Sequence, residues 1–322
     1  MRDQCEKILA LNHHVCVSDD AINVFAKGLS QEDLRMPTWL DDPWMFEGHP
    51  EEVITWLVTY NAINFSYWPD PGEKRWWTTV NGEEVGKDDE ALGVMAVIGE
   101  SIRNGVPFHD WKWLSQLEED ELSAILAPAP KAGKIPLLRE RLEALHDLAG
   151  ARIKYGGPVS LFESCGRSVA KFVNSLVESC PKWKDVGQYA GIEVSFNKRA
   201  WLCGAMIHAR LNHDHHRRFT DSQTIPVFAD YRLPQVLRRV GVMTLSDDLS
   251  ARIEQCQPVG AGSPEEVALR AAVVAACFRI QDALHKHGRE TQLMNIDHML
   301  WRDAVANDES NPPFHRTRTT AY

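Results

Sequence analysis

The sequence predicts a mainly α-helical protein, because helical periodicity dominates its 322 residues and strand signals are short and few. The clearest helix covers residues 263–288, where Ser263 and Glu266 form a capping box at the start and a glycine follows the end. The strongest strand signal is an Asn-Gly pair between apolar or β-branched runs in residues 75–85, which is typical of a hairpin. We therefore expect a single compact helical domain over residues 1–322, with at most a small β-hairpin element.

Two further helices are predicted by their starts, ends and apolar stripes. One begins at Pro50, with two glutamates in its first turn, and its apolar residues follow three-and-four spacing. The other covers residues 136–150, where leucines form a stripe and Gly150 suits the end. Residues 127–136 are rich in Pro, Ala and Gly and are predicted to be a loop inside one domain rather than an interdomain linker.

Composition excludes several classes of protein. The net charge is −10 and no basic stripe stands out, which argues against binding of long nucleic acid. The seven cysteines are scattered and form no C-x-x-C pair, so we expect reduced thiols in the cytoplasm. The N-terminus lacks the apolar core of a signal peptide, and no apolar run approaches the ~18 residues of a membrane span. No membrane partner is expected.

Four stretches combine aromatic rings with polar or ionisable groups. They are NAINFSYWPD (61–70), FNKRAW (196–201), FADYRLPQ (228–235) and NIDHMLW (295–301). Aromatic faces with a few directed polar groups suit a flat heterocycle. Each stretch taken alone is also consistent with the edge of an amphipathic helix that carries a salt bridge.

The four stretches together resemble the queuosine-salvage proteins, the queuosine 5'-phosphate N-glycosylase/hydrolase family. The matching motifs follow the family's order: N-F-S-Y-W (64–68), K-R-A (198–200), F-A-D-Y-R-L-P-Q (228–235), G-S-x-x-E (262–266), I-D-x-x-L-W (296–301) and H-R-T-R-T (315–319). Two positions depart from the pattern. Trp201 stands where the family has Gln, and the tail ends in Thr320-Ala321-Tyr322 rather than in further aromatic residues.

The resemblance implies a helical fold similar to that of the DNA glycosylases. It also implies hydrolysis of the N-glycosidic bond of queuosine 5'-monophosphate, which releases queuine and ribose 5-phosphate for queuine salvage into tRNA modification. No cofactor is implied, and oligomeric state is left open. A base-excision glycosylase acting on nucleic acid and a non-catalytic carrier of queuine or nucleotide are the alternatives.

Two aspartates are predicted to be catalytic. A carboxylate near the anomeric carbon stabilises an oxocarbenium-like sugar and activates a water, and Asp230 is the candidate, as base or as covalent nucleophile. Its competing interpretation is a buried ion pair with Arg232. Asp297 is the second candidate, because a 7-deazapurine lacks a ring nitrogen to protonate and needs help at its remaining polar edge. A helix N-terminal acid is the alternative for Asp297.

The other predicted site residues fall into three groups. Candidates for stacking on the base are Phe65, Trp68, Phe228 and Trp301. The alternative for each of them is a place in the hydrophobic core. Candidates for hydrogen bonds to the base or ribose are His49 and Asn64, although a histidine before a helix also suits a cap. Candidates for the 5'-phosphate are Lys198, Arg199, Tyr231 and Arg232, beside a helix predicted to begin at Pro234.

The histidine cluster LNHDHHRRF (211–219) is predicted to be a solvated loop and not a metal site, because its histidines lack regular i, i+4 pairing. No metal ligand is therefore assigned.

Overall fold

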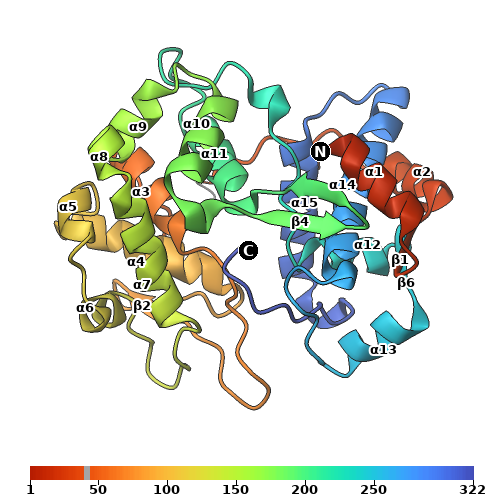
Figure 1. The fold of residues 1–322 in the computed structure, drawn as a ribbon, viewed down its shortest axis with the longest axis horizontal. Coiled ribbons are helices and arrows are strands. Elements are labelled where there is room, and N and C mark those ends of the chain that lie inside the picture. Colours follow the sequence, from red (N-terminus) through yellow and green to blue (C-terminus); the bar gives the residue numbers. More distant parts are fainter. Residues whose placement is uncertain (40–43) are drawn as a thin grey trace. The chain divides into compact units, whose positions relative to one another are not determined.

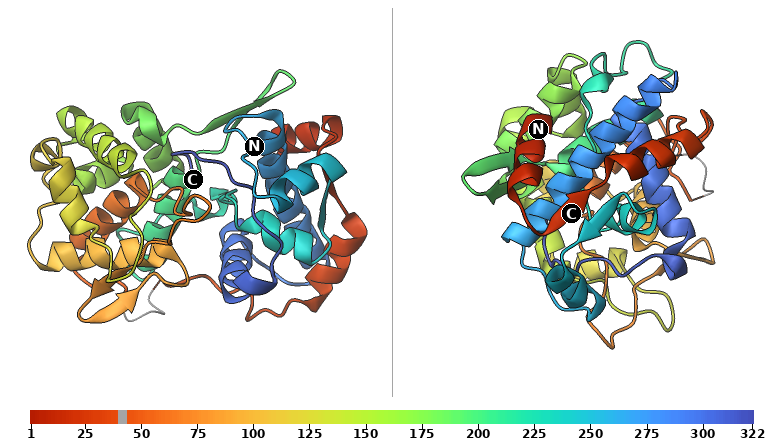
Figure 2. Two further views of the ribbon diagram at one scale, coloured as in Figure 1. Left: turned by 90° about the horizontal axis from the view of Figure 1, so that it is seen from below. Right: turned by 90° about the vertical axis from the view of Figure 1, so that its right-hand side faces the viewer.

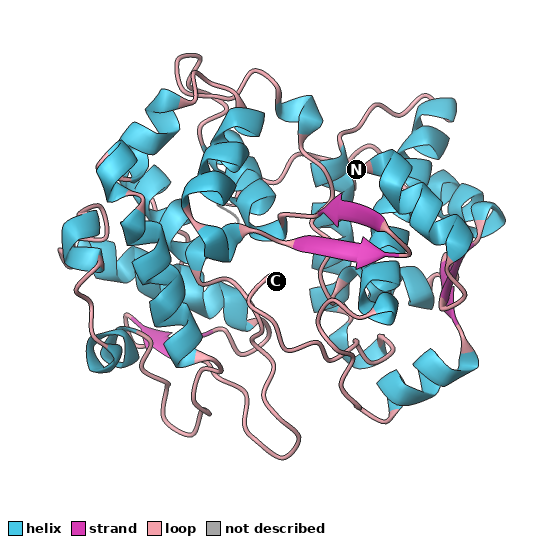
Figure 3. Ribbon diagram, in the orientation of Figure 1, coloured by secondary structure: helices cyan, strands magenta, loops and turns pink. Residues whose placement is uncertain are grey.

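The computed structural model describes residues 1–39 and 44–322, and its fold is mainly α (Figure 1). Helices hold 53% of the described residues, and the described strands form only two-stranded sheets (Figure 3). The predicted fold class is confirmed, while the likeness to DNA glycosylases stays a prediction. The chain divides into two compact units. Unit 1 is Met1–Pro37, Asp185–Lys198 and Ile225–Thr319, and unit 2 is Thr38–Lys184, Arg199–Thr224 and Thr320–Tyr322.

Unit 1 is built around one long buried helix, α14 (Pro264–Lys286). Its middle is apolar on all sides and alanine-rich, so neighbouring helices approach it closely. The elements packed on it are α1 (Arg2–Leu11), β1 (Val15–Val17), α2 (Asp19–Gly28), β4 (Val186–Tyr189), α12 (Leu233–Arg239) and α15 (Leu293–Ala306). The right-hand view of Figure 2 shows α1 alongside α14. Unit 1 is completed by β5 (Ile192–Ser195), β6 (Met243–Leu245), α13 (Asp247–Glu254) and a short 3-10 turn, η3 (Asp308–Ser310).

The start of α14 matches the sequence prediction in part. The Ser263 hydroxyl accepts the N–H of Glu266 at 3.3 Å, as expected of a capping residue. The Glu266 carboxylate accepts the N–H of Gly262 at 3.2 Å. Gly288, with φ of +72°, follows the end of the helix in the left-handed conformation that glycine favours.

Unit 1 contains two strand pairs that the sequence did not predict. β1 pairs with β6 in antiparallel register, Val15 opposite Leu245. β4 and β5 form a hairpin through Ala190 and Gly191, whose φ values of +47° and +79° suit a tight two-residue turn.

Unit 2 contains the other helices. They are α3 (Pro50–Ala62), α4 (Glu90–Arg103), α5 (Trp111–Leu114), α6 (Glu119–Ile125), α7 (Leu138–Gly150), α8 (Arg152–Tyr155), α9 (Pro158–Ser164), α10 (Val169–Ser179), α11 (Lys198–Arg210) and the turns η1 (Pro181–Trp183) and η2 (Ser222–Thr224). The predicted helices at Pro50 and up to Gly150 are confirmed as α3 and α7. The chain passes from unit 1 into unit 2 at the first turn of α11.

The predicted Asn-Gly hairpin is also confirmed in unit 2. β2 (Thr78–Val80) pairs with β3 (Glu83–Val85), and the two turn residues both have positive φ. Helix α3 is buried from Val53 to Ala62 and packs against α4, α7 and α9.

Across residues 1–39 and 44–322, none of the helices combines the length and the apolar character needed to cross a membrane.

Candidate active site

The segment Phe228–Arg232 leads into α12 and carries Asp230 at its centre. Oδ1 of Asp230 accepts the backbone N–H of Arg232 at 2.8 Å and that of Leu233 at 3.4 Å. The carboxylate therefore supports the start of α12, and this fixes its orientation. Asp230 is only 8% exposed. Its Oδ2 lies 3.8 Å from Nζ of Lys198, so a buried ammonium balances its charge.

Lys198 is held at this point by a closed turn after the β4–β5 hairpin. Oδ2 of Asp185 accepts the N–H of Lys198 at 3.1 Å, and Oδ1 of Asn197 accepts the N–H of Asp185 at 3.0 Å. Asn197 has φ of +46°, a conformation that asparagine tolerates better than most residues. The turn places the first residue of α11 beside the Phe228–Arg232 segment, within unit 1.

Asp297 is the second carboxyl group of this cluster. It lies on α15, is 6% exposed, and its Oδ1 accepts the N–H of Phe228 at 2.7 Å. Burial, and next the charge of Asp230, raise the pKa of Asp297 well above its ordinary value, against the lowering effects of the Phe228 N–H and of Lys198. The N-cap of α15 is Gln292, so Asp297 is a buried interior residue and not the helix N-terminal acid considered above.

The charges of the cluster balance if Asp297 carries a proton. One ammonium, Lys198, then faces one carboxylate, Asp230, and the neutral Asp297 has an O–H to donate. A carboxyl group that burial keeps neutral, beside a second carboxyl group, is a common arrangement for acid and base roles.

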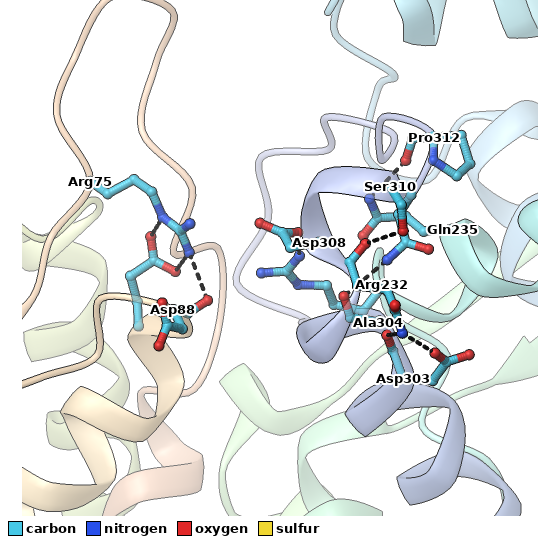
Figure 4. Close-up of polar contacts among 12 residues, drawn as sticks. Arg75, Asp88, Arg232, Gln235, Asp303, Ala304, Asp308, Ser310 and Pro312 are labelled. Carbon is cyan, nitrogen blue, oxygen red and sulfur yellow. Dashed lines mark hydrogen bonds and ion pairs between the residues drawn. The ribbon is translucent and has the colours of Figure 1, made fainter.

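Arg232 and Tyr231 extend from the same segment. Nη1 of Arg232 lies 2.5 Å from Oδ1 of Asp308, and Figure 4 shows these two residues together. Arg232 thus forms an ion pair with Asp308, whereas its contact with Asp230 is through the backbone N–H. This corrects the interpretation of an Asp230–Arg232 ion pair. The Tyr231 ring is half-buried and lies 5.0 Å from that of Phe314.

In unit 2, Phe65 follows the C-terminal end of α3, and Arg199 of α11 contacts that end. The guanidinium of Arg199 donates to the carbonyls of Asn61, at 3.3 Å, and Ala62. That of Arg141 donates to the carbonyl of Phe65 at 2.7 Å. Both guanidinium carbons lie over the Phe65 ring, that of Arg141 at 4.6 Å and that of Arg199 at 5.2 Å from its centre. Because Phe65 is 1% exposed and Arg199 satisfies helix-end carbonyls, these contacts favour structural roles over the predicted base stacking and phosphate binding.

The remaining predicted site residues are His49, Asn64, Trp68, Trp301 and Phe228. His49 is exposed at the N-cap position of α3, and its backbone N–H donates to the Glu52 carboxylate at 2.8 Å. Asn64 and Trp68 are buried in unit 2. Trp301 is half-buried on α15, its ring stacked on that of His298 at 5.8 Å. Phe228 is buried, and its backbone N–H donates to Asp297.

Three supporting residues were missed by sequence reasoning: Arg141, Asp185 and Arg270. Each is buried and charged. The available signal was an arginine within an apolar helix, Arg270 in the alanine-rich run of α14 and Arg141 in the leucine stripe of α7. Such residues are rarely buried without a partner. No cluster of three His, Cys, Asp or Glu side chains able to hold a metal ion occurs in the described parts of the chain.

Comparison with known proteins identifies the family. The model of the queuosine salvage protein family matches residues 44–322. A relative from Sphaerobacter thermophilus, named queuosine 5'-phosphate N-glycosylase/hydrolase, is 28% identical over 96% of this chain and 93% of its own. Relatives of the same name from Bos taurus and Schizosaccharomyces pombe are 27% and 25% identical, over 85% and 86% of this chain and 83% and 86% of theirs. Because the family model matches most of its length, the chain belongs to the queuosine salvage protein family.

Proposed function

We propose that this protein hydrolyses the N-glycosidic bond of queuosine 5'-monophosphate and releases queuine and ribose 5-phosphate. Family membership and the name shared by its relatives support the substrate. The observation that carries the proposal is the buried pair of carboxyl groups, Asp230 beside Lys198 and Asp297 with a raised pKa. A binding protein gains little from an acid and a base held together in this way.

Asp230 acts on the sugar side of the bond. As C1' loses the base it gains positive charge, which a nearby carboxylate stabilises. Asp230 also orients a water and accepts its proton while the water oxygen bonds to C1'. Lys198, 3.8 Å away, offsets the negative charge of the carboxylate and helps to hold it in place, a role that its geometry favours over the predicted contact with phosphate. Direct attack by Asp230 on C1' is the other route open to the same residue.

Asp297 acts on the base side. The bonding electrons of the broken bond pass to the 7-deazapurine, which has a carbon where purines have the basic N7. Negative charge on the departing base is therefore stabilised through its remaining polar edge. A neutral carboxylic acid can donate a hydrogen bond or a proton there, and burial keeps Asp297 in this form.

Arg232 and Tyr231 are the phosphate-binding candidates that unit 1 offers. Arg232 already binds one oxyanion, the carboxylate of Asp308, whose side chain is 39% exposed. A phosphate dianion presents more charge and more acceptor oxygens than this carboxylate and competes for the same donors. The predicted contacts of His49, Asn64 and Trp68 with base or ribose remain part of the proposal.

The first test measures, by chromatography, the release of free queuine from queuosine 5'-monophosphate and from unphosphorylated queuosine. We expect turnover of the monophosphate to be faster. Arg232→Lys should raise KM for the monophosphate and leave the nucleoside reaction unchanged, because lysine cannot bind phosphate through two parallel N–H groups. Arg239→Lys is the matched control, since Arg239 lies on the same helix and pairs with Asp303. Binding of both compounds without release from either would refute the hydrolase and favour a carrier.

A further inference from the structure

Arg270 is a buried arginine that contacts both segments of the candidate site. It lies within α14 and is 2% exposed. Its Nη1 and Nη2 donate to the two oxygens of Asp185 at 2.7 and 2.5 Å, and its Nε donates to the carbonyl of Ala229 at 3.0 Å. The guanidinium carbon lies 4.0 Å from the centre of the Phe196 ring. Glu266, one turn earlier, accepts from Nη1 at 3.5 Å.

These contacts join the two segments that carry Asp230 and Lys198. The Ala229 carbonyl belongs to the peptide unit that precedes Asp230, so Nε of Arg270 fixes that unit. Asp185, held by the two terminal nitrogens, accepts the backbone N–H of Lys198 at 3.1 Å. The guanidinium is planar and rigid, so its three donors hold both segments at one mutual distance.

We propose that Arg270, through Asp185 and Ala229, is a positioning residue that sets the separation of Lys198 and Asp230 for hydrolysis. The proposal rests on the proposed function for its kinetic consequence, although not for its geometry. Arg270 does not touch the reacting atoms. Its effect is to hold a charged pair in a buried site, where an error of about 1 Å in placement can reduce a rate about 100-fold.

Lysine at position 270 keeps the positive charge but cannot reproduce the geometry. A single ammonium on a flexible stem cannot hold both Asp185 oxygens and the Ala229 carbonyl with the planar fork of arginine. Asp185→Asn removes the charge of the other partner and breaks the bidentate contact. Both substitutions are close in size to the residues they replace, so both variants are expected to fold with reduced stability.

Arg279 provides the matched control. It lies on the same helix and makes a forked contact of the same kind at a more exposed position, with Nε and Nη2 donating to Glu6 at 3.0 and 2.5 Å and Nη1 donating to Asp19 at 3.0 Å. These partners lie on α1 and α2, away from Phe228–Arg232. Arg279→Lys therefore reports what the loss of an arginine fork from α14 does to stability alone.

The experiment compares kcat, KM and melting temperature of the wild type, Arg270→Lys, Asp185→Asn and Arg279→Lys with queuosine 5'-monophosphate. We expect kcat of the first two variants to fall about 10- to 100-fold, as for other residues that orient catalytic groups, with little change in KM. The melting temperature of Arg279→Lys should fall, while its kcat should stay at the wild-type value. If kcat of Arg270→Lys falls no more than that of Arg279→Lys, the proposal is wrong.

The pH profile gives a readout that a purely structural role would not move. The charged groups facing Asp297 are Asp230 and Lys198, and the thiol of Cys277 lies nearby on α14. If Lys198 moves away in Arg270→Lys, the pKa of Asp297 rises because Lys198 no longer lowers it. The alkaline limb of the kcat profile should then shift to higher pH, and it should stay in place in Arg279→Lys.

Crystal structures separate failure of the inference from failure of the proposed function. In Arg270→Lys we expect the distance from Lys198 Nζ to Asp230 Oδ2 to increase from 3.8 Å. We also expect the Ala229 carbonyl, which loses its hydrogen bond to Nε of Arg270, to move. An unchanged site in that variant overturns the inference, whatever the enzyme hydrolyses. A wild type that does not act on queuosine 5'-monophosphate would instead refute the proposed substrate, and the structures would still decide the positioning role.

Discussion

The backbone N–H of Phe228 donates to Oδ1 of Asp297 at 2.7 Å, although the two residues are 69 positions apart. This bond ties the segment that carries Asp230 to α15, and it brings both carboxyl groups into one buried cluster with Lys198. The N–H stabilises the ionised form of Asp297, yet burial and the charge of Asp230 act in the opposite direction and prevail. The expected result is a neutral acid beside a carboxylate.

Asp230→Asn should abolish most turnover while preserving the fold. Asparagine keeps an oxygen that can accept the N–H groups of Arg232 and Leu233, but it cannot take a proton from water or stabilise positive charge. We expect kcat to fall by about 100-fold or more, with substrate binding retained. Queuine release and calorimetric binding measure the two effects. Asp303→Asn, at a half-buried position of α15 where the aspartate pairs with Arg239, is the control. Turnover of Asp230→Asn within a few-fold of wild type would rule out the assigned role.

Asp297→Asn should change how stability depends on pH. The pKa of Asp297 is raised in the folded state, so the folded protein retains a proton that the unfolded chain loses above its ordinary pKa of 3.8. Its contribution to stability is therefore complete below that value and is lost as pH rises toward the folded pKa. Asparagine is neutral at every pH, so the variant should show a flatter decline of unfolding free energy. Urea unfolding at a series of pH values tests this, and identical slopes would contradict a raised pKa.

Arg141→Lys should destabilise unit 2. Arg141 is fully buried and donates to the carbonyls of Pro136, Ile63 and Phe65. Arg141 also donates to the carbonyl of Ser66 at 3.3 Å. The donors of lysine are on one nitrogen and cannot reach all four carbonyls, and an unpaired buried carbonyl is unfavourable. We therefore expect the free energy of unfolding to fall by about 2–4 kcal/mol.

Arg139→Lys is the control for this change, because Arg139 lies on the same helix and its side chain is 79% exposed. Its unfolding free energy should stay within about 0.5 kcal/mol of wild type. Urea midpoints measure both variants, and equal effects at the two positions would show that the buried contacts of Arg141 add no stability.

His315 should make the protein sensitive to acid. Burial, with smaller effects from Arg270 and Arg238, lowers the pKa of His315 to about 3. As pH falls below the ordinary value of 6.5, the unfolded chain takes up a proton that the folded protein excludes, so stability is lost progressively down to about pH 3. His315→Gln should reduce this slope. His216→Gln, at an exposed position, should not, and matching slopes for His315→Gln and wild type would contradict the prediction.

Local elements were predictable from the sequence because their signals are local. Capping residues, a first-turn proline and three-and-four spacing located α3, α7 and α14, and an Asn-Gly pair located the β2–β3 hairpin. The β1–β6 pair joins strands more than 220 residues apart, and three-residue strands carry almost no pattern of their own. Motifs in a constant order were enough to indicate the family.

By itself the sequence determined the helical class, the family and the identity of the two candidate carboxyl groups. Tertiary structure decided their state and their support. Asp297 is expected to be neutral because distant segments bury it and place Asp230 beside it. Arg199 satisfies carbonyls of α3, and Arg270 joins Ala229 to Asp185. The physical reason is range: backbone conformation depends on neighbours in the chain, whereas burial and charge depend on neighbours in space.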